Sequence, residues 1–196
     1  MNAMTKTNVQ RLPFSVNRTA LLANKSDHAF REFLYNFFTV AERVQEVRRY
    51  LGRRIGISGP QYNLMMAIAE LQGSDGVSVG RVAEYLHVAG PFVTTEAGKL
   101  AQIAYLRKLN DVADKRVWRL SVGPKGWAAL KSLFPGLQQM NDTVFAGISQ
   151  SEFAILRKCL GKLVNNSEPV LAHIGSLKKV RNKLVVQNGP NMGEAR

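Results

Sequence analysis

Four charged side chains stand within the six residues Asp111-Val112-Ala113-Asp114-Lys115-Arg116. On both sides of this group, over Tyr105–Leu109 and Val117–Val122, apolar side chains alternate with basic or polar ones, as they do in β-strands. Two alternating runs joined by a short polar loop predict a β-hairpin. Lys115 and Arg116 would lie at its tip, where cationic side chains can reach a phosphate backbone or the minor groove of DNA.

Two short helices are predicted directly before the hairpin. Ser78 is suited to cap the first of them, which ends near Leu86. Gly90-Pro91 opens the second, over Phe92–Ile103, because a proline in the first turn of a helix costs no hydrogen bond. A short helix, a tight turn and a second helix followed by a hairpin predict a winged helix-turn-helix. The alternative is an ordinary helical pair beside a surface hairpin.

The second of these helices has distinct apolar and polar faces. Its apolar side chains recur at helical spacing, at Val93, Ala97 and Leu100. The polar side chains that project away from that face are Thr94, Thr95 and Lys99. Such a helix can enter the major groove, and the amides of its first turn, at Pro91, can meet phosphate.

The order of residues through this region resembles the MarR family of bacterial transcription regulators. The resemblance rests on Leu86, Val88, Val93-Thr94, Leu100 and Tyr105-Leu106, then D-x-x-D-K-R at 111–116 and L-S-V-G-P-K-G from Leu120 to Gly126. It covers roughly residues 30 to 165. The chain departs from the family at Ala89 and Thr95, where many relatives carry Ser and Arg, and at Glu96, where an apolar residue is common.

The resemblance implies a mainly α fold with a small β-hairpin wing and a helical dimerisation region. By the same resemblance Arg116 would enter the minor groove and Asp114 would position it. A homodimer would read a dyad-symmetric operator, because two recognition helices across a dyad reach half-sites about 10–10.5 base pairs apart. The implied function is that of a repressor released by a small ligand, commonly a phenolic compound or an aromatic acid. Regulation of aromatic catabolism follows as an expectation.

A long amphipathic helix is predicted from Asp27 to Leu51. Its apolar arc is wider than one domain face usually needs, which favours burial against a second subunit. Arg48 lies within this arc, at the same angle as Phe30. An arginine there either extends its head to solvent or pairs with a carboxylate of the protein, and the sharper hypothesis is a cation that holds an acidic ligand.

The family's ligand pocket lies between the first helix, the second helix and the winged domain. The second helix is capped by Ser58-Gly59-Pro60-Gln61 and contains Tyr62. Arg48 and Tyr62 suit an aromatic carboxylate, which offers a ring to pack and a charge to pair. Arg31 and His28 are further ligand-binding candidates near the start of the first helix.

The predicted domain organisation has four regions. They are a basic N-terminal extension (1–26), open to disorder; a helical dimerisation region (27–56 and 124–186); a winged helix DNA-binding domain (57–123); and a disordered tail (187–196). Within 124–186, Pro135-Gly136 predicts a kink or break, Ser149 or Ser151 caps a further helix, and Glu168–Val186 forms a separate last amphipathic segment.

The composition constrains the class of partner. The chain has 196 residues, enough for a sizeable core, and its 27 Lys and Arg against 14 Asp and Glu give a net charge of +13. Such a balance predicts a polyanionic partner, either nucleic acid or an anionic membrane surface. No apolar run approaches the roughly 18 residues of a membrane span, and no signal core opens the chain, so a cytoplasmic protein is expected.

Little in the sequence points to catalysis. The three histidines, His28, His87 and His173, match no metal-ligand spacing, and no phosphate loop or nucleophile motif occurs, so neither an enzyme nor a cofactor or metal is expected. The single cysteine, Cys159, is expected to pack as a small hydrophobe, with redox sensing beside Lys158 and Lys162 as the alternative. Two other classes remain open: a non-specific architectural DNA-binding protein and a basic membrane-surface protein.

Overall fold

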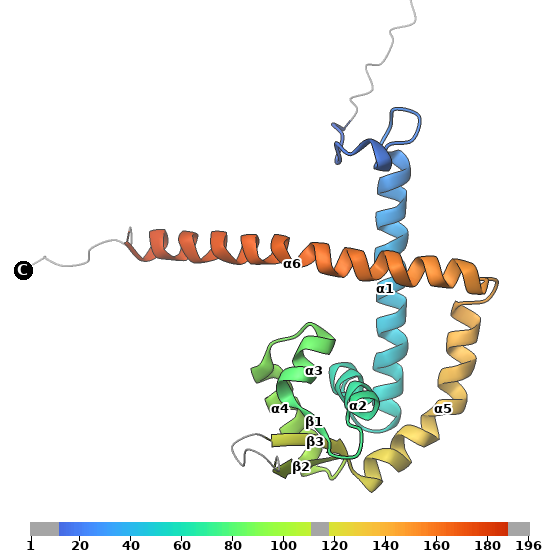
Figure 1. Ribbon diagram of the computed structural model, residues 1–196, viewed down its shortest axis with the longest axis vertical. Coiled ribbons are helices and arrows are strands. Elements are labelled where there is room, and N and C mark those ends of the chain that lie inside the picture. The colour runs from blue at the N-terminus through green and yellow to red at the C-terminus, as the bar shows by residue number, and fades with distance from the viewer. Residues whose placement is uncertain (1–11, 111–117, 188–196) are drawn as a thin grey trace, which may run out of the picture. The chain divides into compact units, whose positions relative to one another are not determined.

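The computed structural model describes residues 12–110 and 118–187, and the chain divides into two compact parts, Met1–Asn141 and Asp142–Arg196. The elements in chain order are the 3-10 helix η1 (Thr19–Leu21), α1 (His28–Arg54), α2 (Gly59–Leu71), β1 (Val77–Ser78), α3 (Val79–Leu86), α4 (Gly90–Gln102), β2 (Leu106–Asn110), β3 (Trp118–Val122), α5 (Pro124–Val144) and α6 (Gln150–Gln187), as labelled in Figure 1. The fold is mainly helical with one small antiparallel sheet, which confirms the predicted class.

Helix α1 begins directly after Asp27, as predicted, but the Asp27 side chain does not cap it. The carboxylate instead accepts hydrogen bonds from the backbone N–H and the hydroxyl of Ser15, both at 2.7 Å, and from Nε of Arg31 at 3.0 Å. Arg31 also donates to the carbonyl of Pro13 at 2.8 Å. These bonds fasten the segment before α1 to the first turn of the helix.

The predicted caps of α2 and α3 are confirmed. At the start of α2, the Gln61 backbone N–H donates to Oγ of Ser58 at 3.3 Å, and the Ser58 N–H donates to Oε1 of Gln61 at 2.9 Å. This reciprocal capping box satisfies two N–H groups that the helix leaves unpaired. Ser78 caps α3 by accepting from the Arg81 N–H at 3.3 Å.

The hairpin is confirmed by the pairing of β2 with β3. The two strands are antiparallel, in register from Leu106 opposite Val122 to Asn110 opposite Trp118. A third strand, β1, pairs with the other edge of β3, with Val77 opposite Leu120. Strand β1 was not predicted, because a strand of two residues is too short to show alternation.

The core of the first part lies where α2, α3, α4, the sheet, the C-terminal end of α1 and the first turns of α5 meet (Figure 1). Its most enclosed side chains are Leu51, Leu64, Met65, Ile68, Val82, Val93, Leu100, Leu120 and Leu130. In α1 only Leu51 and Gly52 are buried, so the N-terminal half of that helix adds nothing to this core. The apolar residues of α4 are buried as its period predicts, which fixes which face of α4 remains outside.

The sequence predicted a kink or a break at Pro135-Gly136 and a last helical segment that begins at Glu168, and the structure excludes the break and that start. Helix α5 continues through Pro135 to Val144 rather than breaking, although it bends along its length in Figure 1. Helix α6 runs unbroken through Pro169, so Glu168–Val186 is not a separate segment. A proline removes one hydrogen bond and crowds one turn, and the turns on either side can hold the helix together.

The second part consists mainly of α6, which is capped at Ser149 by a hydrogen bond from the Glu152 N–H at 3.3 Å. None of its described residues is buried, and apolar residues such as Phe153, Ile155 and Leu171 are at least half exposed. Cys159 is exposed, which contradicts the expected packing within the chain. Among the described residues, no helix has the length and apolarity needed to cross a bilayer.

Candidate nucleic-acid interface

Helix α4 presents a polar outer face because its apolar face is fixed in the core. Thr94, Thr95 and Lys99 are all exposed, and Pro91 occupies the first turn. At 100° per residue, the positions directly opposite the buried face are Thr95 and Gln102. Gln102 is exposed and was not among the predicted residues.

Thr94 lies toward one side of this face. Its hydroxyl donates to the carbonyl of Gly90, one turn earlier, at 3.2 Å. The residue also lines a cavity of about 290 Å³ between α4 and the sheet, together with Ser78, Val79, Gly80, Ala97, Lys108, Trp118 and Leu120. Thr94 therefore stands where α4 adjoins the wing.

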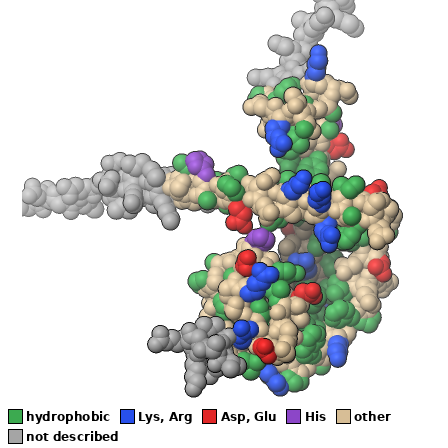
Figure 2. Space-filling view, viewed as in Figure 1, with side chains coloured by type: hydrophobic (Ala, Val, Ile, Leu, Met, Phe, Trp, Pro, Cys, Tyr) green, Lys and Arg blue, Asp and Glu red, His purple; other side chains and the backbone are tan. Residues whose placement is uncertain are grey.

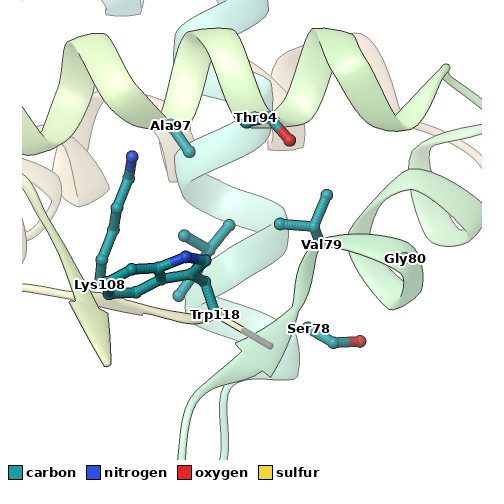
Figure 3. Close-up of a pocket in the computed structure, with 8 residues that line it drawn as sticks. Ser78, Val79, Gly80, Thr94, Ala97, Lys108 and Trp118 are labelled. Carbon is teal, nitrogen blue, oxygen red and sulfur yellow. The ribbon is translucent and has the colours of Figure 1, made fainter. Parts of the chain in front are cut away.

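The floor of this cavity is built by the hairpin. Lys108 and Trp118 lie on the same face of the sheet as buried Leu106 and Leu120, as the register of the strands requires. Figure 3 shows both side chains rising from the sheet toward the helix that carries Thr94 and Ala97.

Lys108 extends the basic surface across to α4. Its Nζ atom comes within 3.8 Å of the position that a Cβ on Gly98 would occupy. Lys108 was not among the predicted site residues, although counting alternate residues from Leu106 places it on this face. On the side shown in Figure 2, Lys and Arg side chains are spread over the winged helix with hydrophobic side chains between them.

Lys99 is not an isolated cation. Its Nζ lies 2.7 Å from Oε1 of Glu96, and Oε2 of Glu96 accepts a hydrogen bond from Nε2 of Gln61 at 2.9 Å. The bond from Lys99, and with it the bond from Gln61, lowers the pKa of Glu96 against the opposing effect of burial. Gln61, which completes the capping box of α2, is therefore bonded directly to α4. No sequence signal marked this contact between residues 35 positions apart.

The predicted wing-tip residues Asp114, Lys115 and Arg116 lie outside the described residues. The strands that lead to them end at Asn110 and begin again at Trp118. These two flanking residues, Asn110 and Trp118, lie opposite each other in the register of the sheet.

Arg48 and Tyr62, the first two ligand-binding candidates, are brought together. The Tyr62 side chain is 3% exposed, and burial raises its pKa, while the nearby Arg48 charge acts in the opposite direction. Arg48 itself is exposed and makes no ion pair within residues 12–110 and 118–177. A buried Arg48 would need an anionic partner, but in the single chain Arg48 is exposed, which agrees with the interpretation that its head extends to solvent.

His28 and Arg31 lie far from that pair. They occupy the first turn of α1, and 17 residues of helix from Arg31 to Arg48 span about 26 Å. The guanidinium of Arg31 is already engaged with Asp27 at 2.9 Å. One small molecule cannot touch both groups within one chain, so the four candidates form two separate places.

Among the described residues, no three His, Cys, Asp or Glu side chains gather in a way that could hold a metal ion. The exposed residues of α4 offer hydroxyl groups at Thr94 and Thr95, an amide at Gln102 and an ammonium group at Lys99. Such groups bind phosphates and base edges.

The sequence matches no protein-family model and no curated protein. The fold, however, is similar to solved structures of MarR-type regulators. The S. aureus MepR–DNA complex has a TM-score of 0.61 at 15% identity, over 69% of this chain and 96% of that one. A MarR family transcriptional regulator from Listeria monocytogenes, complexed with 26mer DNA, has a TM-score of 0.60 at 14% identity, over 82% and 97%.

The PcaV transcriptional regulator from Streptomyces coelicolor, in complex with its natural ligand, has a TM-score of 0.52 at 20% identity, over 66% of this chain and 92% of that one. The PcaV and Listeria proteins are transcriptional regulators, and MepR was solved with DNA. At these identities the likeness concerns the fold, and the chain has the winged-helix fold of MarR-type regulators.

Proposed function

We propose that the protein is a sequence-specific DNA-binding transcription regulator, acting as a homodimer and released from its operator by a small aromatic acid or phenolic compound. The observation that carries this proposal is the outer face of α4. Its polar residues Thr94, Thr95 and Lys99 are exposed on a helix whose other face is locked into the core. Two proteins of the same fold were solved with DNA, and a net charge of +13 suits a polyanionic partner.

In this proposal α4 enters the major groove and the hairpin follows the neighbouring backbone. Thr95, Lys99 and Gln102 would face base edges, and the first turn at Pro91 would approach a phosphate. Lys115 and Arg116 would reach the minor groove or its phosphates, with Asp114 positioning Arg116. Lys108 adds a cation at the base of the wing.

The homodimer is supported by apolar surface that the chain does not cover itself. On α1, Phe33 is 48% exposed and Phe38 is 60% exposed, although both belong to a long helix with two buried residues. On α6, Ile155 and Leu171 are each 64% exposed. Monomeric proteins rarely leave so many large apolar side chains in water, and we propose that a second copy of the chain covers them.

The effector is proposed to bind at Arg48 and Tyr62. Arg48 is an exposed cation near the buried Tyr62, so the carboxylate of an aromatic acid could pair with its guanidinium. A regulator of this fold, PcaV, was solved with its natural ligand, which supports ligand binding by such a scaffold. Repression of an operon for aromatic catabolism is the corresponding role in the cell.

A competition gel shift tests the proposal. The labelled probe is the DNA upstream of the protein's own gene, and the competitors are unlabelled probe and random duplex of the same length. We expect the specific competitor to displace the probe at a concentration at least about 1,000-fold lower than random duplex. Equal competition by the unlabelled probe and the random duplex would favour a non-specific architectural DNA-binding protein. Tighter binding to anionic vesicles than to duplex DNA would favour a membrane-surface protein.

A further inference from the structure

Glu96 lies on α4, and its carboxylate is bonded to two other side chains. One oxygen pairs with Lys99 at 2.7 Å and the other accepts from Gln61 at 2.9 Å. Its side chain is only 14% exposed, whereas that of Lys99 is 56% exposed. Gln61 is itself fixed, because it also completes the capping box with Ser58.

A second acidic residue of the helix-turn-helix provides a contrast. Arg81 and Glu84 on α3 form an ion pair of the same i,i+3 spacing at 2.8 Å. The Glu84 side chain is 70% exposed, so its carboxylate can swing into solvent and leave Arg81 free. The Glu96 carboxylate cannot withdraw in this way without breaking its bond to Gln61.

The difference matters next to a polyanion. A cation that binds a phosphate releases a counterion, and each such contact steepens the salt dependence of binding. A lysine that stays beside a fixed carboxylate forms a pair with no net charge. Such a pair gains little binding free energy from a phosphate. Lys99 can still donate to an acceptor on a base edge, because an ammonium group has three N–H donors.

We propose that Glu96 is a specificity-determining residue: anchored by Gln61, it holds Lys99 on the groove face and prevents Lys99 from acting as a non-specific phosphate contact. This inference rests on the proposed DNA-binding function. Lys99 then contributes to reading an operator and contributes nothing to binding random DNA.

The test measures the affinity of the full-length dimer for a random-sequence duplex as a function of salt. Glu96→Gln keeps an oxygen that can accept from Gln61 and removes the charge that holds Lys99. With one phosphate gained per subunit at about 0.9 each, the slope of log K against log salt should steepen by about 1.8. Affinity would then fall about 12-fold further than for the wild type between roughly 50 and 200 mM salt.

Two lysine variants complete the experiment. Lys99→Gln alone should leave the slope on random duplex unchanged, and Glu96→Gln/Lys99→Gln should return it to the wild-type value. Glu84→Gln is the matched control, since it removes the same charge from an unanchored pair and should steepen the slope by less than half as much. Circular dichroism melting curves confirm that each variant is folded.

Three results would overturn the inference. They are an unchanged slope in Glu96→Gln, an equal change in Glu84→Gln, or a shallower slope in Lys99→Gln alone, which would mean that Lys99 already neutralises a phosphate. The Lys99→Gln variant tests the inference even if Glu96→Gln fails to fold. A wild-type protein that shows no salt-dependent affinity for duplex DNA would instead contradict the proposed function itself.

Discussion

The hydroxyl of Tyr105 donates a 2.9 Å hydrogen bond to the main-chain carbonyl of Ile55. This bond joins the segment between α4 and the hairpin to the turn between α1 and α2, across 50 residues of sequence. The carbonyl of Tyr105 accepts from the Gly123 N–H at 2.9 Å, at the other end of the hairpin. Tyr105 therefore connects the proposed DNA-binding elements to the C-terminal end of α1.

Tyr105→Phe removes the hydroxyl and leaves the Ile55 carbonyl without this donor. We expect the free energy of unfolding to fall by about 1 kcal/mol, the usual net value of one such hydrogen bond. Urea denaturation at a fixed protein concentration measures it, because the stability of a dimer depends on concentration. Tyr85→Phe, at a 49% exposed position, is the control and should change little; equal losses in both variants would show that the Ile55 bond contributes nothing.

Gly126 lies where α5 passes closest to the hairpin. A Cβ at this position would overlap the Tyr105 carbonyl oxygen and come within 2.9 Å of Cγ1 of Val122. We expect Gly126→Ala to lower the free energy of unfolding by about 1–3 kcal/mol, since the backbone must move to accommodate it.

Gly136→Ala, in the same helix, provides a control with the opposite expected sign. Nothing lies within 4 Å of a Cβ at that position, so alanine should stabilise the helix by about 0.5–1 kcal/mol. If both substitutions stabilise the protein, the close approach of α5 to Tyr105 is not a feature of the folded state.

Much of this fold could be predicted from local signals. The capping residues Ser58 and Ser78 and the alternation around the hairpin located α2, α3 and the wing. Local rules left alternatives open elsewhere. At Pro135 they allowed a kink or a break, and α5 continues through that residue to Val144. At Arg48 they allowed solvent or an anionic partner, because helical periodicity identifies the apolar face but not what covers it.

The candidate site was less predictable than the fold. Exposure of Thr94, Thr95 and Lys99 followed from the period of α4, but the bond from Gln61 to Glu96 depends on how two distant helices pack. Lys108 could have been found by counting alternate residues along β2, since the register of a strand determines which face a side chain occupies.

Asp27 gives a prediction about pH. The backbone N–H of Ser15, then its hydroxyl, and to a smaller extent Arg31, lower the pKa of Asp27 from 3.8 to about 2, although burial acts to raise it. A carboxyl whose pKa is depressed by folding stabilises the protein fully above its unfolded value, and that contribution is lost as the pH falls through the folded value. The window therefore lies between about pH 4 and pH 2.

Asp27→Asn should consequently be less stable than the wild type at pH 6, and the difference should shrink as the pH falls through this window. Thermal unfolding from pH 6 to pH 2 measures it. Asp75→Asn, at an exposed turn position, should show no such narrowing. A difference that stays constant down to pH 2 would mean that the Asp27 charge does not hold Ser15.

Arg48→Met tests the effector proposal. Because Arg48 is exposed, its replacement should change the free energy of unfolding by no more than about 0.5 kcal/mol and leave DNA binding intact. We expect release from DNA by benzoate or salicylate to be lost, as followed by gel shift. Arg43→Met, another exposed arginine of α1, should still respond, and a responsive Arg48→Met would exclude Arg48 from the effector site.

Footprinting on the DNA upstream of the protein's own gene tests the central claim most directly, because it reports both the site and its symmetry. A dimer with two α4 helices should protect a short dyad-symmetric segment whose half-sites are centred about 10–10.5 base pairs apart. Protection should appear at concentrations that leave random DNA of equal length uncovered. Uniform protection along the whole fragment, or none at concentrations that saturate anionic vesicles, would contradict the assignment of a sequence-specific regulator.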